Sequence, residues 1–188
     1  MEKNIIFCTD LPYIVKPLLD FFIHNNFNVY LYTKKPDKVE FKKLDPIIII
    51  SYSYSHIFSK EIIDEFSNRI INIHLSCLPY NKGYRPTVWS VVYHYILNYP
   101  MGVTIHKIDY DIDTGPILFQ EKVRVNKYKD TLRSVWLKHH FTVQRLFLLN
   151  WDKIIKGNVK IKIQKKERNY NSKKKYKKFL EPIILKYG

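Results

Sequence analysis

The sequence predicts an α/β protein with a doubly wound, mostly parallel sheet flanked by helices. Short β-branched or aromatic runs recur through the first half of the chain, and segments with helical spacing of apolar residues separate them. A composition of 46% hydrophobic and 26% charged residues is that of a globular protein. At 188 residues the chain is long enough to bury one sizeable core.

Four segments of the first half are expected to be buried strands. Each is short, and three of the four are bounded by turn-forming residues. They are NIIFC at 4–8, NVYLY at 28–32, PIIIIS at 46–51 and RIINIH at 69–74. Because helices are expected between them, these strands should run parallel to one another.

The expected helices follow from apolar spacing and capping residues. The apolar residues of 11–26 follow helical spacing, and Ser59 is placed to cap a helix over 59–66. Another helix should begin near Thr87 and carry Trp89 on its core face. Helices at these places would cover the faces of a parallel sheet.

The second half changes character. Residues 101–108 and 115–125 alternate in period two around the link DYDIDT, which predicts adjacent strands joined by a functional loop. A long helix should start near Asp130 and present an apolar face up to Trp151, so that it covers the sheet.

Charge is unevenly distributed along the chain. The formal net charge is +15, and residues 151–188 hold thirteen basic against three acidic residues. We therefore expect a catalytic domain at 1–163 and a basic C-terminal tail at 164–188, with a linker-like stretch at 165–178. A solvated Lys-rich end is favoured over a patch for an anionic partner, and nucleic-acid binding is not expected.

Cysteine usage and hydropathy indicate the compartment. Two cysteines without a CxxC pair disfavour both a disulfide scaffold and a thiolate zinc site. No apolar run is long enough for a signal peptide or a membrane span. A soluble, cytoplasmic protein with no membrane partner is expected.

Polar residues that suit acyl transfer gather between residues 72 and 120. Asn72 and His74 lie two residues apart near a strand end, so both side chains project from one face of the sheet. The amide can donate to a carbonyl oxygen that gains charge, and the imidazole can move a proton. Asp113, turned inward by the Thr114-Gly115 turn, should raise the pKa of His74 and orient its ring.

Other interpretations of these residues stay open on the sequence alone. A lone histidine at a strand end is more often structural, and DIDTG could be an ordinary acidic hairpin. The region also offers possible metal ligands at His74, His106, Asp109, Asp111 and Asp113. Because HxH and HExxH spacings are absent, no metal is expected.

Two separated motifs carry a family resemblance. INIHLSCLPYNKGYRPTVWSVV, followed by MGVTIHKIDYDIDTGPILFQEKVRV, resembles the formyltetrahydrofolate-dependent formyltransferases, whose signature is N-x-H-x-S-x-L-P and a downstream GVTIH…DTG. The resemblance implies a Rossmann-like formyltransferase fold and an enzyme that transfers a formyl group from formyltetrahydrofolate. Asn72, His74 and Asp113 match the family's catalytic trio, in which Asn72 and protonated His74 stabilise an oxyanion and Asp113 orients His74.

The resemblance also implies where the folate's pterin ring lies, between two loops of the sheet. The corresponding residues here are His56, Ile57, Phe58, Ile108, Asp109 and Tyr110. Apolar side chains with nearby backbone hydrogen-bonding groups suit a planar heterocycle, although core packing explains each position equally well.

Departures from family patterns bear on the acceptor amine. FCTDLPYIV contains no glycine, which disfavours phosphoribosylglycinamide, and it lacks the Gly-Thr-Pro-Asp turn of methionyl-tRNA formyltransferases. Those enzymes also carry a C-terminal domain that is not expected after Asn150. The stretch LPYNKGYRPTVW most resembles the small enzymes that act on nucleotide-linked amino sugars, such as a dTDP-4-amino-4,6-dideoxyhexose. It implies Lys82 and Arg85 as phosphate contacts and Tyr84 as a stacking residue.

Two further expectations follow. A catalytically silent folate- or nucleic-acid-binding relative is the alternative to an enzyme. Apolar residues beyond Ile161 suggest a possible homodimer, since related sugar enzymes often dimerise.

Overall fold

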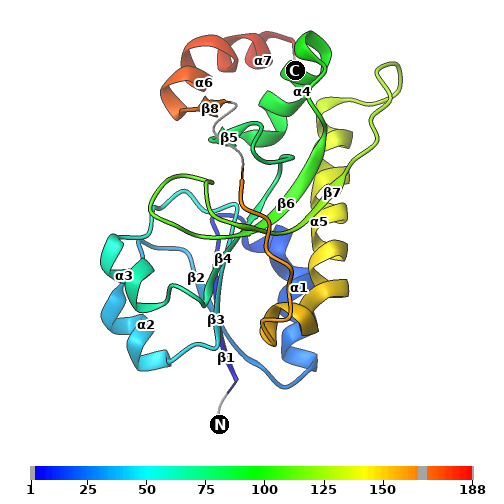
Figure 1. The fold of residues 1–188 in the computed structure, drawn as a ribbon. Helices are drawn as coiled ribbons and strands as arrows, with labels where there is room; N and C mark the ends of the chain where they lie inside the picture. Colours follow the sequence, from blue (N-terminus) through cyan, green and yellow to red (C-terminus); the bar gives the residue numbers. More distant parts are fainter. Residues whose placement is uncertain (1–2, 165–168, 188) are drawn as a thin grey trace.

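The computed structural model describes residues 3–164 and 169–187, and within them a six-stranded sheet forms the centre of the molecule (Figure 1). Its strand order is β2-β1-β3-β4-β6-β7. The strands are β1 (Asn4–Cys8), β2 (Asn28–Tyr32), β3 (Ile48–Tyr52), β4 (Ile70–His74), β6 (Gly102–Lys107) and β7 (Ile117–Lys122). The first four pair in parallel and the last two antiparallel, which confirms the expected mostly parallel α/β fold.

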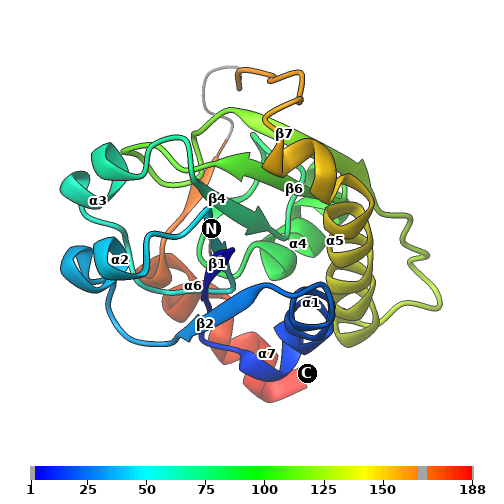
Figure 2. The same cartoon turned by 90° about the horizontal axis from the view of Figure 1, so that it is seen from below.

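Helices cover both faces of the sheet, and the views of Figures 1 and 2 agree on this layering. One face carries α1 (Pro12–His24) and α5 (Leu132–Ile155), and the other carries α2 (Lys38–Leu44) and α3 (Lys60–Glu65). The remaining elements lie beyond one end of the sheet (Figure 1). They are β5 (Lys82–Gly83), α4 (Pro86–Leu97), β8 (Tyr170–Asn171), α6 (Lys173–Phe179) and α7 (Glu181–Tyr187).

The larger core lies under α1 and α5. Phe22 of α1 packs edge-on against Phe147 and Trp151 of α5, and alternate residues of β1, β3, β4 and β6 join them. A capping box formed by Thr131 and Ser134 begins α5, one residue from the expected start. The long covering helix predicted from the sequence is confirmed.

The opposite face is covered by a helix that the sequence analysis missed. In α2, the Asp37 side chain accepts hydrogen bonds from the amides of Val39 and Glu40, and Phe41 packs into the second apolar cluster. A seven-residue helix shows little apolar periodicity, but Asp37 followed by Glu40 is a helix-start signal. Ser59 is the N-cap residue of α3, as predicted, although its side chain accepts no capping hydrogen bond.

One strand prediction needs correction. Residues 28–32 form β2 as expected, but only Tyr32 of that strand is buried. The strand lies at the edge of the sheet, so one side is open to solvent. The expected pairing of the strands from 101–108 and 115–125 is confirmed, since β6 and β7 are antiparallel neighbours.

The stretch at 165–178 was expected to be linker-like, but its residues 169–178 are ordered in β8 and α6, although most of its lysines are exposed. β8 pairs with β5, and the amide of Tyr84 donates to the carbonyl of Asn171. Asn171 and Tyr176 are buried against this neighbour, which explains why a Lys-rich stretch is ordered. Residues 165–168 of the predicted linker lie outside the described residues.

Two buried histidines of α5 make stability depend on pH. Burial lowers the pKa of His139 to about 4 and that of His140 to about 3. The unfolded chain therefore binds protons below its ordinary histidine pKa of about 6.5 while the folded chain does not. Stability should be complete above pH 6.5 and fall as pH drops towards 4, by about 2 kcal/mol per histidine at pH 5.

Urea unfolding at pH 7 and pH 5 measures this effect. His139→Gln and His140→Gln should each reduce the difference between the two pH values, because glutamine does not titrate. An unchanged difference in both variants would contradict the assignment.

No helix within the described part of the chain is long and apolar enough to cross a membrane.

Candidate active site

The sheet presents a polar strip on the side opposite the larger core. In β4 and β6 the alternate residues of the core are isoleucine or valine, so the residues between them project from the other face. Asn72 lies opposite His106 in the antiparallel register, and His74 lies opposite Thr104. Neighbouring β4 and β6 thus place two imidazoles and an amide side by side.

The loop between β6 and β7 brings a carboxylate onto this strip. The Asn72 amide donates to Asp113 Oδ1 at 3.1 Å, and Oδ1 lies 3.5 Å from His74 Nδ1 and 3.4 Å from His106 Nε2. The backbone amide of Gly83 donates to Oδ2 at 2.8 Å. The structure therefore brings Asn72, His74 and Asp113 together, although 41 positions separate Asn72 from Asp113 in the chain.

The backbone of Asp113 adopts a left-handed conformation that neighbouring hydrogen bonds stabilise. Its φ is 57°, which is costly for a residue with a side chain. The Thr114 hydroxyl donates to Asp109, and the Gln164 amide donates to the carbonyls of Asp113 and Gly115. The loop is thus fixed from both sides of the carboxylate.

Gly115→Ala should displace this loop. An added Cβ would stand 1.8 Å from the carbonyl oxygen of Lys107, so the backbone must shift. We expect a loss of stability of about 2 kcal/mol or more and a loss of activity, because Asp113 would move away from His74. Gly157→Ala, which meets no atom within 4 Å, has a positive φ and serves as a control for left-handed strain alone. Equal unfolding midpoints for the two variants would contradict a specific clash at Gly115.

Charge at the cluster resides on Asp113. Its burial favours the neutral acid, but the imidazoles of His74 and His106 and the Gly83 amide outweigh this and hold its pKa well below the usual range. The carboxylate is therefore ionised at neutral pH. It is the acceptor that the surrounding donors share.

Asp113 raises the His74 pKa as expected, but the net shift of this pKa is downward. Burial lowers this pKa, and neighbouring His106 and Lys82 add to the lowering, while Asp113 and the Asn81 carbonyl raise it by less. The carboxylate favours the charged ring, but a ring that is only 5% exposed has lost the water that would stabilise its charge. His74 is consequently neutral at pH 7 in this structure. Its Nε2 faces the Asn81 carbonyl at 3.1 Å.

His106 belongs to the cluster, although the sequence analysis considered it only as a possible metal ligand. Its Nδ1 lies 2.7 Å from the Lys107 carbonyl, which requires a proton on Nδ1. Its Nε2 then faces Asn72 Nδ2 at 3.1 Å. The alternation in GVTIH puts His106 on the same face of its strand as Thr104. This pattern could have revealed His106 if the antiparallel pairing of β6 with β4 had been assumed. Among the residues that the structure describes, no three metal-ligating side chains are placed to hold an ion.

The six residues expected at a pterin ring differ in exposure. Ile57 and Tyr110 are exposed and His56 lies on the surface, whereas Phe58 is buried in the cluster under α2 and α3. Ile108 packs against the same cluster, and Asp109 accepts from Thr114. The Tyr110 hydroxyl donates to Asp64 of α3, so the 108–110 loop lies against the helix that follows the 56–58 loop in the chain. Exposed apolar surface is thus present at Ile57 and Tyr110.

The residues expected at acceptor phosphates surround β5. Lys82 is 2% exposed, and its ammonium has no hydrogen-bond or ion-pair partner in the described residues. Tyr84 is half-buried and Arg85 is exposed. All three flank Gly83, whose amide holds Asp113, so they adjoin the catalytic strip.

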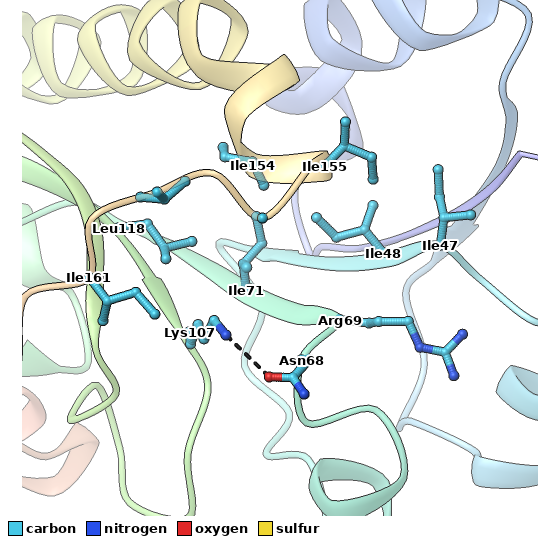
Figure 3. A pocket seen from close by; sticks show the side chains of 12 residues that line it. Ile47, Ile48, Asn68, Arg69, Ile71, Lys107, Leu118, Ile154, Ile155 and Ile161 are labelled. Carbon is cyan, nitrogen blue, oxygen red and sulfur yellow. Dashed lines mark hydrogen bonds between the residues drawn. The ribbon is translucent and has the colours of Figure 1, made fainter.

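A separate apolar cavity of about 180 Å³ lies at another part of the sheet, between β3, β4, β7 and the chain after α5 (Figure 3). Isoleucines make up half of its lining residues, and the Lys107 ammonium donates to the Asn68 side chain within the lining. None of the residues predicted for catalysis, folate or acceptor lines this cavity.

The fold and the strip together define an α/β protein with a buried amide, imidazole and carboxylate cluster on its sheet. Comparison with known proteins identifies the family. The formyl transferase family profile matches residues 16–149, which is more than half of the chain. This chain belongs to the formyl transferase family.

Individual relatives differ in the amine named for them. The dTDP-4-amino-4,6-dideoxyglucose formyltransferase of Mycobacterium tuberculosis is 32% identical over 129 residues, covering 69% of this chain and 52% of that protein. The methionyl-tRNA formyltransferase of Thermodesulfovibrio yellowstonii is 33% identical over 129 residues, covering 69% and 41%. The chain thus spans about half the length or less of these curated relatives.

A solved structure matches over nearly the whole chain. The formyltransferase PseJ from Anoxybacillus kamchatkensis, in complex with UDP-4,6-dideoxy-4-formamido-L-AltNAc and tetrahydrofolate, has a TM-score of 0.82 and 33% identity. The match covers 99% of this chain and 93% of PseJ.

Proposed function

We propose that this protein transfers a formyl group from formyltetrahydrofolate to the amino group of a nucleotide-linked amino sugar. The observation that carries the proposal is the shared Asp113 Oδ1, which lies within 3.5 Å of Asn72 and His74 in a buried site. The similarity to PseJ, whose structure holds a formylated UDP-sugar and tetrahydrofolate, supports both substrates.

Formyltetrahydrofolate would supply the formyl carbon that the acceptor amine attacks. The new C–N bond would replace the bond to the folate nitrogen, and the proton lost by the amine would go to that nitrogen as tetrahydrofolate leaves. Asn72 and His74 then stabilise the negative charge that develops on the formyl oxygen. Both ring nitrogens of His74 face oxygen atoms, Nδ1 towards Asp113 and Nε2 towards the Asn81 carbonyl. A proton taken up by the ring is therefore held between two acceptors, and Asp113 orients the ring and assists proton movement.

The donor site uses the loops at 56–58 and 108–110. Ile57 is 68% and Tyr110 63% exposed, and a flat ring laid across them would remove this apolar surface from water. Lys60 lies over the Tyr110 ring at 5.3 Å and fixes it beside α3. Phe58 and Ile108 support the loops from the core.

The acceptor site adjoins β5. Lys82, Tyr84 and Arg85 flank the Gly83 amide that binds Asp113, so an acceptor whose phosphates meet these residues would bring its amine near the cluster. In this division residues 1–163 supply the catalytic groups, and residues after 164 border the acceptor.

Two further proposals concern assembly and compartment. Exposed apolar side chains of α4, α6 and α7 favour a homodimer formed through these helices. They are Tyr95, Ile96, Leu97, Phe179, Ile183 and Leu185. Cys8 and Cys77 are buried free thiols, which suits the reducing cytoplasm.

Mass spectrometry of full-length protein incubated with formyltetrahydrofolate and candidate amines tests the function. The candidates are a panel of nucleotide-linked amino sugars, methionyl-tRNA and phosphoribosylglycinamide. We expect a formyl mass gain on one sugar nucleotide and none with Asp113→Asn. Gain on methionyl-tRNA alone would replace the acceptor, and no gain on any amine would defeat the proposal.

A further inference from the structure

The surface beside the catalytic strip carries two cations whose partners are aromatic rings. The Arg85 guanidinium lies over the Tyr84 ring, 5.5 Å from its centroid, and over the Tyr176 ring at 6.0 Å. The Lys173 ammonium lies over the same Tyr84 ring at 5.8 Å. Neither cation forms an ion pair with a carboxylate of the described residues.

This convergence places like charges together. Because both cations stand over one ring, they lie within about 11 Å of each other. Both side chains are exposed, so water and salt screen the repulsion between them, and both charges are open to a ligand from solvent. An incoming ligand with two or more negative charges can pair with both cations.

The backbone conformation of Arg85 also favours a functional role for this residue. Its φ of 54° is left-handed, at a position that caps α4 and precedes Pro86. Glycine is the residue that adopts this conformation at least cost, and a residue before proline is further restricted. An arginine is held here at a conformational cost, and its side chain covers the rings of Tyr84 and Tyr176.

The C-terminal segment supplies half of this arrangement. Tyr176 is 8% exposed and meets Tyr84 edge-on at 5.4 Å. The pairing of β5 with β8 sets Lys173 beside Tyr84, and Lys175 secures α6 by bonding to the Tyr93 hydroxyl. Residues that the sequence describes as a basic tail thereby border the β5 loop.

The cluster is close to the catalytic groups. Gly83, whose amide binds Asp113, is two residues from Arg85, which a chain can span in at most about 7 Å. A small anionic ligand that bridges Arg85 and Lys173 can therefore extend to the strip. Tyr84 is occupied by its cations, so it acts as a positioning residue and not as a free stacking platform.

We infer that Arg85 and Lys173, held over Tyr84 and Tyr176, bind the diphosphate of the acceptor's nucleotide. The inference rests on the proposed function and adds the C-terminal helix α6 to the acceptor site. The glutamyl carboxylates of a folate offer similar chemistry, and the test separates these two anions.

Calorimetric titration of the full chain with UDP or dTDP, and separately with folinic acid, tests the assignment. Arg85→Gly suits the left-handed backbone and Lys173→Ala lies on an exposed position, so both variants should stay folded, as a thermal melt will verify. Each should weaken nucleoside diphosphate binding about tenfold or more and leave folinic acid binding unchanged. Tyr84→Leu removes the ring beneath both cations and should also weaken nucleoside diphosphate binding.

Lys174→Ala is the matched control, because it removes the same charge from the same helix without a ring partner in the described residues. Unchanged nucleoside diphosphate affinity in both cation variants would overturn the inference, as would weakened folinic acid binding in its place. Absence of nucleoside diphosphate binding by the unaltered chain would also overturn it. If these affinities fall as expected but no amine is formylated, the phosphate site stands and the proposed reaction fails.

Discussion

Asp113→Asn should lower the rate of formyl transfer about a thousandfold or more. Both carboxylate oxygens accept: Oδ1 receives the Asn72 amide and lies beside His74 Nδ1, and Oδ2 receives the Gly83 amide. An asparagine offers one acceptor and one donor, so its NH₂ must face another donor on one side. The ring of His74 would lose its orientation, and the site would lose the negative charge that stabilises a buried imidazolium.

Single-turnover rates with saturating substrates measure this loss, with unfolding followed in urea alongside. A buried donor left without its acceptor costs about 1–3 kcal/mol, so part of the stability should also be lost. Asp111→Asn, exposed in the same loop, is the matched control and should retain normal turnover. Near-normal turnover of Asp113→Asn would remove this carboxylate from the mechanism.

His74→Ala should lower turnover at least about a hundredfold, because one ring both stabilises charge on the formyl oxygen and moves a proton. Since Asp113 acts largely through His74, the double variant should be little slower than the slower single variant. Losses that multiply in the double variant would show that the two groups act independently. A rapid single variant would defeat the assignment of His74.

The pH dependence of turnover provides a second readout of His74. Burial lowers its pKa, and the neutral ring takes up a proton during transfer, so activity should fall as pH drops below the ordinary histidine range. Activity that instead rises as pH falls would contradict this role of the neutral ring. Asp113→Asn lacks the charge that raises the His74 pKa. The acid limb of its pH–activity profile should therefore lie at lower pH than that of the unaltered protein.

Local patterns accounted for most of the sheet and for the members of the motif. Period-two and helical spacing are readable in a short window, so the strands at 4–8 and 69–74 and the long α5 were predicted within a residue or two. The family motifs likewise pointed to Asn72, His74 and Asp113. Short elements without periodicity, such as α2 and α6, were missed for the same reason.

Sites formed by residues far apart in sequence could be recognised only once the pairing of the strands was known. His106 enters the cluster through the antiparallel register of β6 with β4, and β2 is exposed because it is an edge strand. The C-terminal segment looked solvated by its charge, yet β8 pairs with β5 and buries Asn171. Which strands pair depends on residues far apart in the chain, so it cannot be predicted from the composition of one segment.

The sequence by itself determined the fold class, the order of the sheet-forming segments and the family to which the chain belongs. The tertiary structure decided the charge state of the site and the surroundings of the acceptor loop. His74 is neutral because burial outweighs the attraction of Asp113, and Arg85 and Lys173 lie over the same Tyr84 ring because two strands pair across 88 positions. Desolvation and strand pairing depend on which distant residues exclude water from a group, and only the folded chain brings those residues together.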